Sequence, residues 1–108
     1  MINEASSTGA SEQIVNSGSD SLSVQVSGTF SGVKVEVQGK TDENASEWTS
    51  LAVIDRSTAT AVEGADGITA KGIYSVNIAG LVVVRVNVAS VSGGNVTVVG
   101  AFESSTEN

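Results

Sequence analysis

Two short polar segments of the sequence, residues 42–47 and residues 63–66, carry the oxygen-bearing side chains that could bind a metal ion. Calcium prefers such ligands, and an EF-hand loop places glycine at its sixth position and a ligand at its twelfth. In a loop that begins at Asp42 these positions hold Glu47 and Val53, so the sequence excludes an EF-hand. A looser calcium site built from both segments stays open, although acidic side chains in turns are mostly solvated.

The same acids could serve as the paired carboxylates of a glycoside hydrolase, which face each other across a cleft. Asp42, Glu43 and Glu63 are the candidates, but they flank turns, where solvent surrounds them. The sequence contains neither histidine nor cysteine, which excludes Ser-His-Asp and Cys-His catalysis and histidine-ligated metals. We therefore predict a protein that is not an enzyme and needs no cofactor.

The charge balance excludes further classes of partner. Twelve acidic residues against five basic ones leave a net charge of -7 at pH 7, whereas binding to nucleic acid or to an anionic membrane needs a basic surface. No segment reaches the roughly 18 to 20 apolar residues of a membrane span, and the N-terminus lacks the pattern of a signal peptide. We expect one complete, soluble domain without a nucleic-acid or membrane partner.

Alternating apolar and polar residues indicate that β-strands position these side chains. Val33, Val35 and Val37 alternate with Lys34 and Glu36 between two glycines, which is typical of a half-buried strand. The same period of two recurs in residues 21–30, 47–54, 72–80, 81–90 and 96–103, and more weakly in residues 58–62. No window has a helical period, and β-branched residues dominate. We therefore expect an all-β fold, an antiparallel two-sheet β-sandwich of jelly-roll or immunoglobulin-like type, with the jelly roll favoured.

Composition divides the chain into three parts. Residues 1–20 are small, polar and acidic, which predicts a flexible N-terminal arm whose Ile14 and Val15 could anchor it on a partner. Residues 21–103 are expected to form the β-sandwich domain, and residues 104–108 a short polar C-terminal tail. Only the middle part is apolar enough to build a core.

Three positions interrupt the regular alternation and suggest local structure. Gly28 indicates a β-bulge, and the run SGGN at residues 92–95 predicts a hairpin turn. Trp48 follows a polar loop and precedes Leu51, so we expect it to plug the core where the loop enters a strand. One Trp, one Tyr and two Phe are too few for an aromatic platform that binds sugars.

Arg85 stands in the most apolar strand, between Val84 and Val86. Its aliphatic stem could cover an outer sheet face, or its guanidinium could pair with an acid within the domain or across a subunit contact. Val83 shares the face of Arg85, which favours the pair with an acid because that face is not fully polar.

Four runs of the sequence carry a resemblance to a known module: SGTFSGVKVEVQG, EWTSLAV, AKGIYSVNIAGLVVVRVNVAS and SGGNVTVVGAF. The matching positions are turn and core residues, namely Gly28, Thr29, Phe30, Gly32, Trp48, Leu51, Gly72, Ile73, Tyr74, Val76, Ala79, Gly80, Leu81, Arg85, Val86 and Gly93. Over residues 21–103 the chain resembles a β-sandwich module of tailed-bacteriophage virion proteins, of the head decoration and head fibre type. Relatives often have a tight Asp-Gly turn before the tryptophan, where this chain has the longer TDENASE loop.

The resemblance implies a structural role and no catalytic residues. Its first implication is a protein that decorates or cements a phage capsid by binding the major capsid protein on the outer surface of the virion, as a homo-oligomer with a trimer favoured. The alternative is a receptor- or carbohydrate-binding module of a phage head or tail fibre, with recognition in residues 41–46 and 63–67. The candidate partner contacts are Ile14, Val15, Asp42, Glu43, Asn44 and Arg85.

Overall fold

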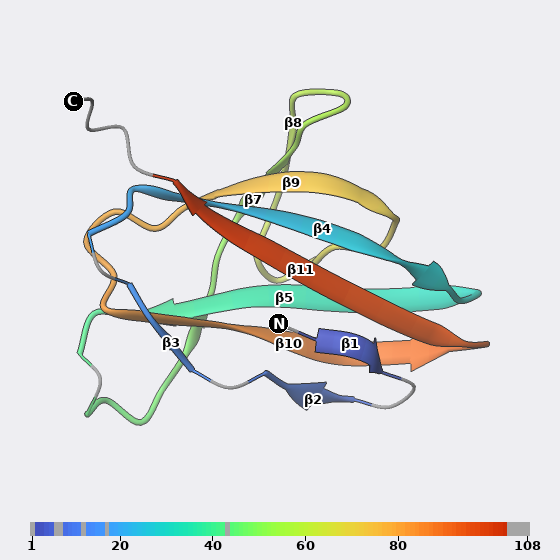
Figure 1. The fold of residues 1–108 in the computed structure, drawn as a ribbon, viewed down its shortest axis with the longest axis horizontal. Helices are drawn as coiled ribbons and strands as arrows, with labels where there is room; N and C mark the ends of the chain where they lie inside the picture. Colours follow the sequence, from blue (N-terminus) through green and yellow to red (C-terminus); the bar gives the residue numbers. More distant parts are fainter. Residues whose placement is uncertain (1, 6–7, 12, 17, 43, 104–108) are drawn as a thin grey trace.

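The computed structural model describes residues 2–5, 8–11, 13–16, 18–42 and 44–103 and shows two antiparallel sheets (Figure 1). In the six-stranded sheet the order is β1 (Ile2–Ala5), β11 (Asn95–Glu103), β4 (Ser21–Thr29), β9 (Gly72–Asn77), β7 (Val53–Asp55) and β8 (Thr60–Val62). In the five-stranded sheet the order is β2 (Gly9–Ala10), β10 (Val83–Ser92), β5 (Gly32–Lys40) and β6 (Thr49–Ser50), and β3 (Ile14–Val15) also pairs with β10. The predicted all-β sandwich is confirmed.

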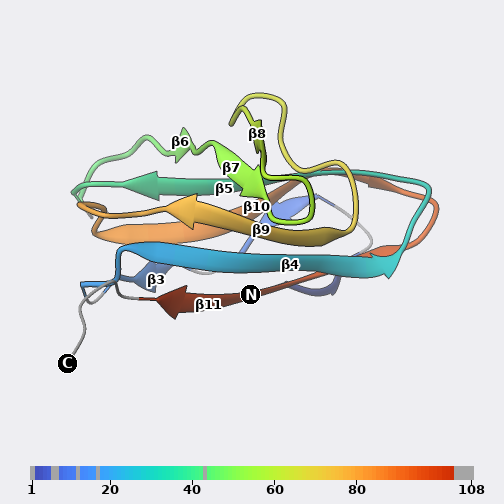
Figure 2. The same ribbon diagram turned by 90° about the horizontal axis from the view of Figure 1, so that it is seen from above.

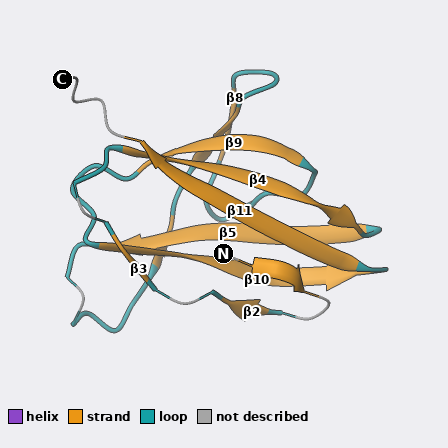
Figure 3. Ribbon diagram, viewed as in Figure 1, coloured by secondary structure: helices purple, strands orange, loops and turns teal. Residues whose placement is uncertain are grey.

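Strands and loops make up all of the described chain (Figure 3). Accordingly, none of the residues placed in the structure belongs to a helix long and apolar enough to cross a membrane.

The core forms where the inward residues of the long strands meet between the two sheets. Every second residue along these strands is buried, as the alternation predicted: Leu22, Val24, Val26, Val33, Val35, Val37, Val84, Val86, Val88, Val96 and Val98. Because burying one valine side chain contributes about 1.5 kcal/mol or more, this shared core holds the two sheets together. The outward residues of the same strands are left to form the two surfaces of the sandwich.

Two connections at one end of the molecule join strands of different sheets. Residues 30–31 link β4 to β5, and residues 93–94 link β10 to β11 (Figures 1 and 2). The hairpin predicted at residues 92–95 is therefore wrong: β10 pairs with β5, and β11 pairs with β4 in the opposite sheet. Adjacent glycines permit a sharp reversal of the chain, but they do not decide whether the two strands become partners.

These two connections pack directly against each other. The amide of Ser31 donates to the carbonyl of Ser92 at 2.9 Å. Gly28 is paired with Val96 in an unbroken register between β4 and β11, so the predicted bulge at Gly28 is wrong. A Cβ atom on Gly28 would instead collide with the carbonyl oxygen of Asn95, so glycine is needed here for the close approach of the two strands.

The predicted strand at residues 47–54 is divided between the sheets. Its first part, β6, pairs with β5, whereas β7 pairs with β8 and β9 in the six-stranded sheet. Leu51 lies between the two parts and packs against the core. The chain therefore crosses the edge of the sandwich here, which a local period of two does not indicate.

The N-terminal segment differs from the flexible arm that composition predicted. β1 pairs with β11, and β2 and β3 pair with β10, so the described parts of residues 2–16 add strands to both sheets. This is possible because main-chain groups of an open sheet edge pair with a neighbouring strand whatever its side chains are. The predicted C-terminal tail, residues 104–108, lies outside the described residues.

The stability of the fold depends on pH through Tyr74 on β9. Its ring is buried, and its hydroxyl donates to the carbonyl of Ala70 at 2.8 Å. Burial raises the pKa of Tyr74 above its ordinary value of 10.0, and the Asp55 carboxylate raises it further. Because the folded-state pKa exceeds the unfolded one, this contribution to stability is complete below about pH 10 and is lost as the pH rises through the folded pKa.

Replacing Tyr74 with phenylalanine is expected to lower the free energy of unfolding by about 1 kcal/mol at neutral pH, since the carbonyl of Ala70 loses its donor. Above about pH 10 the variant should lose less stability than the wild type, because it has no phenol to ionise. Urea unfolding followed by circular dichroism at neutral and alkaline pH measures both effects. Equal alkaline losses in the two proteins would contradict the assignment.

Candidate functional site

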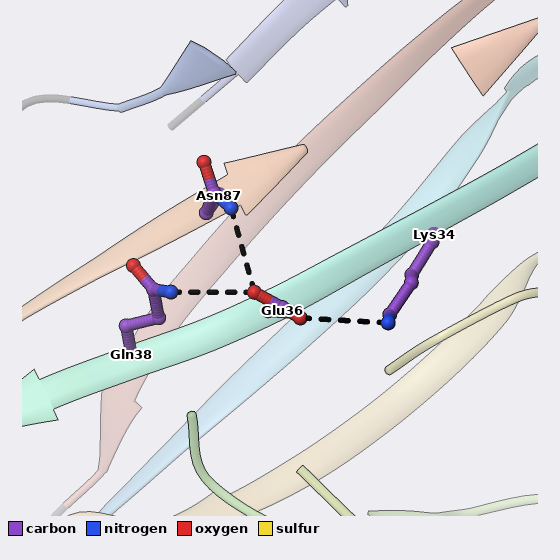
Figure 4. A network of polar contacts seen from close by, with 4 residues as sticks. All are labelled: Lys34, Glu36, Gln38 and Asn87. Carbon is purple, nitrogen blue, oxygen red and sulfur yellow. Dashed lines mark hydrogen bonds and ion pairs between the residues drawn. The ribbon is translucent and has the colours of Figure 1, made fainter. Parts of the chain in front are cut away.

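The outer face of the five-stranded sheet carries a connected network of polar side chains (Figure 4). Glu36 is its centre: one carboxylate oxygen accepts from Gln38 at 3.3 Å and from Asn87 at 3.4 Å, and the other lies 3.8 Å from the Lys34 ammonium. The Glu36 side chain is only 15% exposed, although it points away from the core. The polar half of β5 is therefore an ordered surface.

Arg85 extends this network toward the only tryptophan of the chain. It stands opposite Gln38 in the register, and its Nε donates to the Gln38 side-chain oxygen at 2.7 Å. The guanidinium carbon lies 4.2 Å from the centre of the Trp48 ring, and the Lys40 ammonium lies 4.6 Å from it. We call Gln38, Lys40, Trp48 and Arg85 the Trp48 cluster.

The position of Trp48 corrects the prediction of a core plug. The ring is half-buried, lies over two cations on the outer face and is not part of the core cluster. Its orientation follows from the strand period, because Trp48 is two residues before Ser50, which pairs with the outward Gln38. Sequence reasoning missed the cluster because it did not identify the pairing of residues 49–50 with β5.

The polar loop before Trp48 is a turn with its acids in solvent. The Asp42 carboxylate accepts from the amide of Asn44 at 2.9 Å, and the Asp42 carbonyl accepts from the amide of Ala45. Asp42, Asn44 and Glu47 are exposed, and Glu43 lies outside the described residues. Asp42 and Asn44 are therefore exposed residues of the loop that precedes Trp48 in the sequence.

Glu63 and Asp66 lie in a second exposed turn, closed by a hydrogen bond from the Asp66 amide to the Glu63 carbonyl at 3.0 Å. Across the placed residues, no three acidic side chains come close enough to hold a metal ion.

The two apolar candidates of the N-terminal segment point in different directions. Ile14 packs against the core from β3, whereas Val15 is 64% exposed. Their strand pairs with Val83 and Val84 of β10. Ile14 therefore holds the segment on its own sandwich, and Val15 faces the solvent.

The outer face of the six-stranded sheet is a second surface, and it contrasts with the first. Val99, Gln25 and Ile73 lie side by side across β11, β4 and β9, with Val99 54% and Ile73 45% exposed. The next row runs from Ala101 through Ser23 and Ser75 to Ile54. We call these seven residues the uncharged face: Ser23, Gln25, Ile54, Ile73, Ser75, Val99 and Ala101. The sequence signal for the uncharged face is that Ile73 and Val99 are apolar at outward positions of their strands, and the prediction from sequence did not use this signal.

Comparisons with known proteins agree with this fold. A family model described as XepA matches residues 1–102. The crystal structure of the SPBc2 prophage-derived protein YomS is similar, with a TM-score of 0.79 and 28% sequence identity over 93% of this chain and 85% of that chain. The crystal structure of the PBSX exported protein XepA has a TM-score of 0.82 and 21% identity over 93% of this chain. Among curated proteins there is no significant match.

The two solved structures differ in how much of them this chain represents. The chain covers 85% of the prophage-derived protein but only 34% of the PBSX exported protein, so it spans about a third of the latter. At 21% identity the second likeness shows the fold alone. The XepA family match and the prophage-derived structure support a phage-related protein, and both solved structures support the β-sandwich fold.

Proposed function

Because the chain belongs to the XepA family, and because its fold is that of a prophage-derived protein, we propose that it is a structural protein of a phage particle. In this proposal it decorates or cements the capsid by binding the major capsid protein at the outer surface. The observation that carries the proposal is the Trp48 cluster, an ordered surface that contains a tryptophan and an arginine, two residue types enriched at protein interfaces.

The composition and order of the Trp48 cluster support a role in protein binding. Tryptophan and arginine are enriched among the residues that dominate binding energies at interfaces. Here the arginine is already held by a hydrogen bond and by the ring, so it loses little conformational entropy when a partner binds. Asp42 and Asn44 in the neighbouring loop, and Val15 on β3, are further exposed candidates for the contact.

We further propose that the protein acts as a homo-oligomer, with a trimer favoured. Copies that each carry a net charge of -7 repel one another, and the repulsion is weakest where both surfaces lack charge. The uncharged face, with Val99, Ile73 and Ile54 exposed, meets this requirement. The double variant Ile73→Lys/Val99→Lys is expected to dissociate, because it places like charges on both sides of the contact. Light scattering of the wild type and of the variant measures this.

Purified protein is expected to bind undecorated capsids of its own phage at a fixed saturating ratio, because decoration sites repeat with the capsid lattice. Cosedimentation with capsids measures this, and Trp48→Ala is expected to weaken binding roughly 10-fold or more, as for a central interface residue. The control Phe102→Ala removes an aromatic ring outside the cluster. Wild-type protein that stays in the supernatant at all capsid concentrations would end the proposal.

A receptor- or carbohydrate-binding module of a phage fibre is the second candidate. It is favoured by the half-buried Trp48 next to an exposed polar loop, since recognition residues often lie on loops over a rigid sheet. A glycan array with labelled protein separates the two functions, because capsid decoration predicts no bound glycan. Saturable glycan binding that is lost in Trp48→Ala would favour this second candidate.

A further inference from the structure

Basic residues gather on one face of an acidic protein. The chain has five basic residues and a net charge of -7, and Lys34, Lys40 and Arg85 all stand on the outer face of the five-stranded sheet. Lys34 is paired with Glu36 there, and Lys40 donates to the carbonyl of Ala45. Two of the three cations of this face therefore have an oxygen partner within the domain, and Arg85 is the third.

Arg85 has no acid partner among the residues that the structure describes. Its Nε donates to the neutral Gln38, and its two terminal amino groups make no hydrogen bond there. The ion pair between Lys34 and Glu36 is the one that the described residues contain. The pairing with an acid that the sequence favoured is thus not made within the described part of the domain.

The surroundings of Arg85 fix its direction. The Gln38 oxygen holds Nε, and the Trp48 ring lies against the guanidinium carbon. Neither contact is a hydrogen bond from the terminal amino groups. These groups form the fork that matches the two oxygens of a carboxylate. An arginine used only to cover the sheet with its stem would need neither contact.

We propose that the terminal amino groups of Arg85 bind a carboxylate side chain of a partner protein, with Trp48 as the adjoining contact. This rests on the proposed function only in that the partner is a protein. The partner differs from this chain, because a second copy would bring a net charge of -7 to a surface bordered by Asp42 and Glu47. It presents an aspartate or glutamate on a surface that is otherwise neutral or basic.

Trp48 is the only tryptophan, so its fluorescence reports directly on the site. A capped tripeptide with a central glutamate, flanked by alanine and leucine, serves as the probe, and the same peptide with glutamine is its control. We expect a saturable change with the glutamate peptide and binding about 10-fold weaker with the glutamine peptide, as for loss of a charged hydrogen bond. Equal affinities for the two peptides would overturn the proposal.

Matched arginine variants locate the interaction. Arg85→Gln is expected to weaken the glutamate peptide about 10-fold, and Arg85→Lys to recover part of the loss, because lysine keeps the charge but not the fork. Arg56→Gln removes the same charge from an exposed position in the turn after β7 and should change the affinity less than twofold. Equal effects of Arg85→Gln and Arg56→Gln would show nonspecific attraction and overturn the assignment.

Two further measurements distinguish the possible causes of a negative result. The first excludes a folding defect of the variants, and the second tests the proposed function apart from this inference. In the folded wild type, the NMR signal of the Arg85 Nε proton should shift with the glutamate peptide only. Capsid binding is measured separately: capsids that bind wild type and Arg85→Gln equally, while peptide binding also does not depend on Arg85, would refute the carboxylate site and leave decoration intact. Peptide binding that depends on Arg85, in a protein that does not bind capsids, would support the carboxylate site and refute decoration.

Discussion

Replacing Gly94 with alanine is expected to lower the free energy of unfolding by about 2 to 4 kcal/mol, from overpacking and backbone strain together. Gly94 has a φ of +149°, and a Cβ atom added there would overlap the carbonyl oxygen of Thr29. That oxygen belongs to the last residue of β4, which is paired with Asn95, so it has little room to move. The loss should appear in urea unfolding followed by circular dichroism.

Gly9→Ala is the matched control for Gly94→Ala. Gly9 has nearly the same φ, +154°, but no atom lies within 4 Å of an added Cβ. Its substitution therefore reports the backbone strain, about 1 to 3 kcal/mol, without the steric overlap. If both variants lose the same stability, the close approach of the two connections contributes nothing, and the physical reason given for Gly94 is wrong.

Replacing Asn16 with alanine is expected to lower the free energy of unfolding by about 2 to 3 kcal/mol, because it removes four hydrogen bonds to partly buried main-chain groups. The Asn16 side-chain amide donates to the carbonyls of Ser19, Ile78 and Leu81 at 3.1, 3.3 and 3.0 Å. Its oxygen accepts from the amide of Ser19 at 2.8 Å. This one side chain joins the N-terminal segment to the loop between β9 and β10.

Asn77→Ala is the control, since Asn77 is exposed and its side chain accepts one hydrogen bond, from the amide of Ala79. A loss of about 0.5 to 1 kcal/mol is expected there. Hydrogen exchange adds a local readout: amides of residues 9–11 and 13–15 should lose protection in Asn16→Ala more than the amides of β4. Unchanged stability and exchange in Asn16→Ala would support the independent arm that composition predicted.

The inward positions of the long strands could be predicted because they depend on a local property. Side chains of a strand alternate between its faces, so the pattern of Val33, Val35 and Val37 identifies their buried face without knowledge of any neighbour. The same holds for Val84, Val86 and Val88. Local alternation therefore identified the strand class and most of the core.

The candidate site could be predicted only in part, because it depends on pairing between distant residues. The sequence predicted Arg85 and the loop at residues 42–44 as partner contacts, but the stacking of Arg85 on Trp48 requires β6 to pair with β5 and β5 to pair with β10. A tryptophan between a loop and a strand gives no sign of which sheet face it will cover. The local sequence predicted Trp48 in the core, whereas the pairing register of β6 with β5 places it on the outer surface.

The sequence by itself determined the all-β class, the inward residues of the sandwich, the acidic charge and the absence of histidine and cysteine chemistry. Tertiary structure alone decided the partners of each strand, the use of Gly94 as a crossing between sheets, the pairing of the N-terminal segment with β10 and β11, and the outward Trp48. The physical reason is that side-chain alternation is encoded over a few neighbouring residues. Main-chain hydrogen bonds between strands are nearly independent of side chains, so their pattern is chosen by the packing of the whole core.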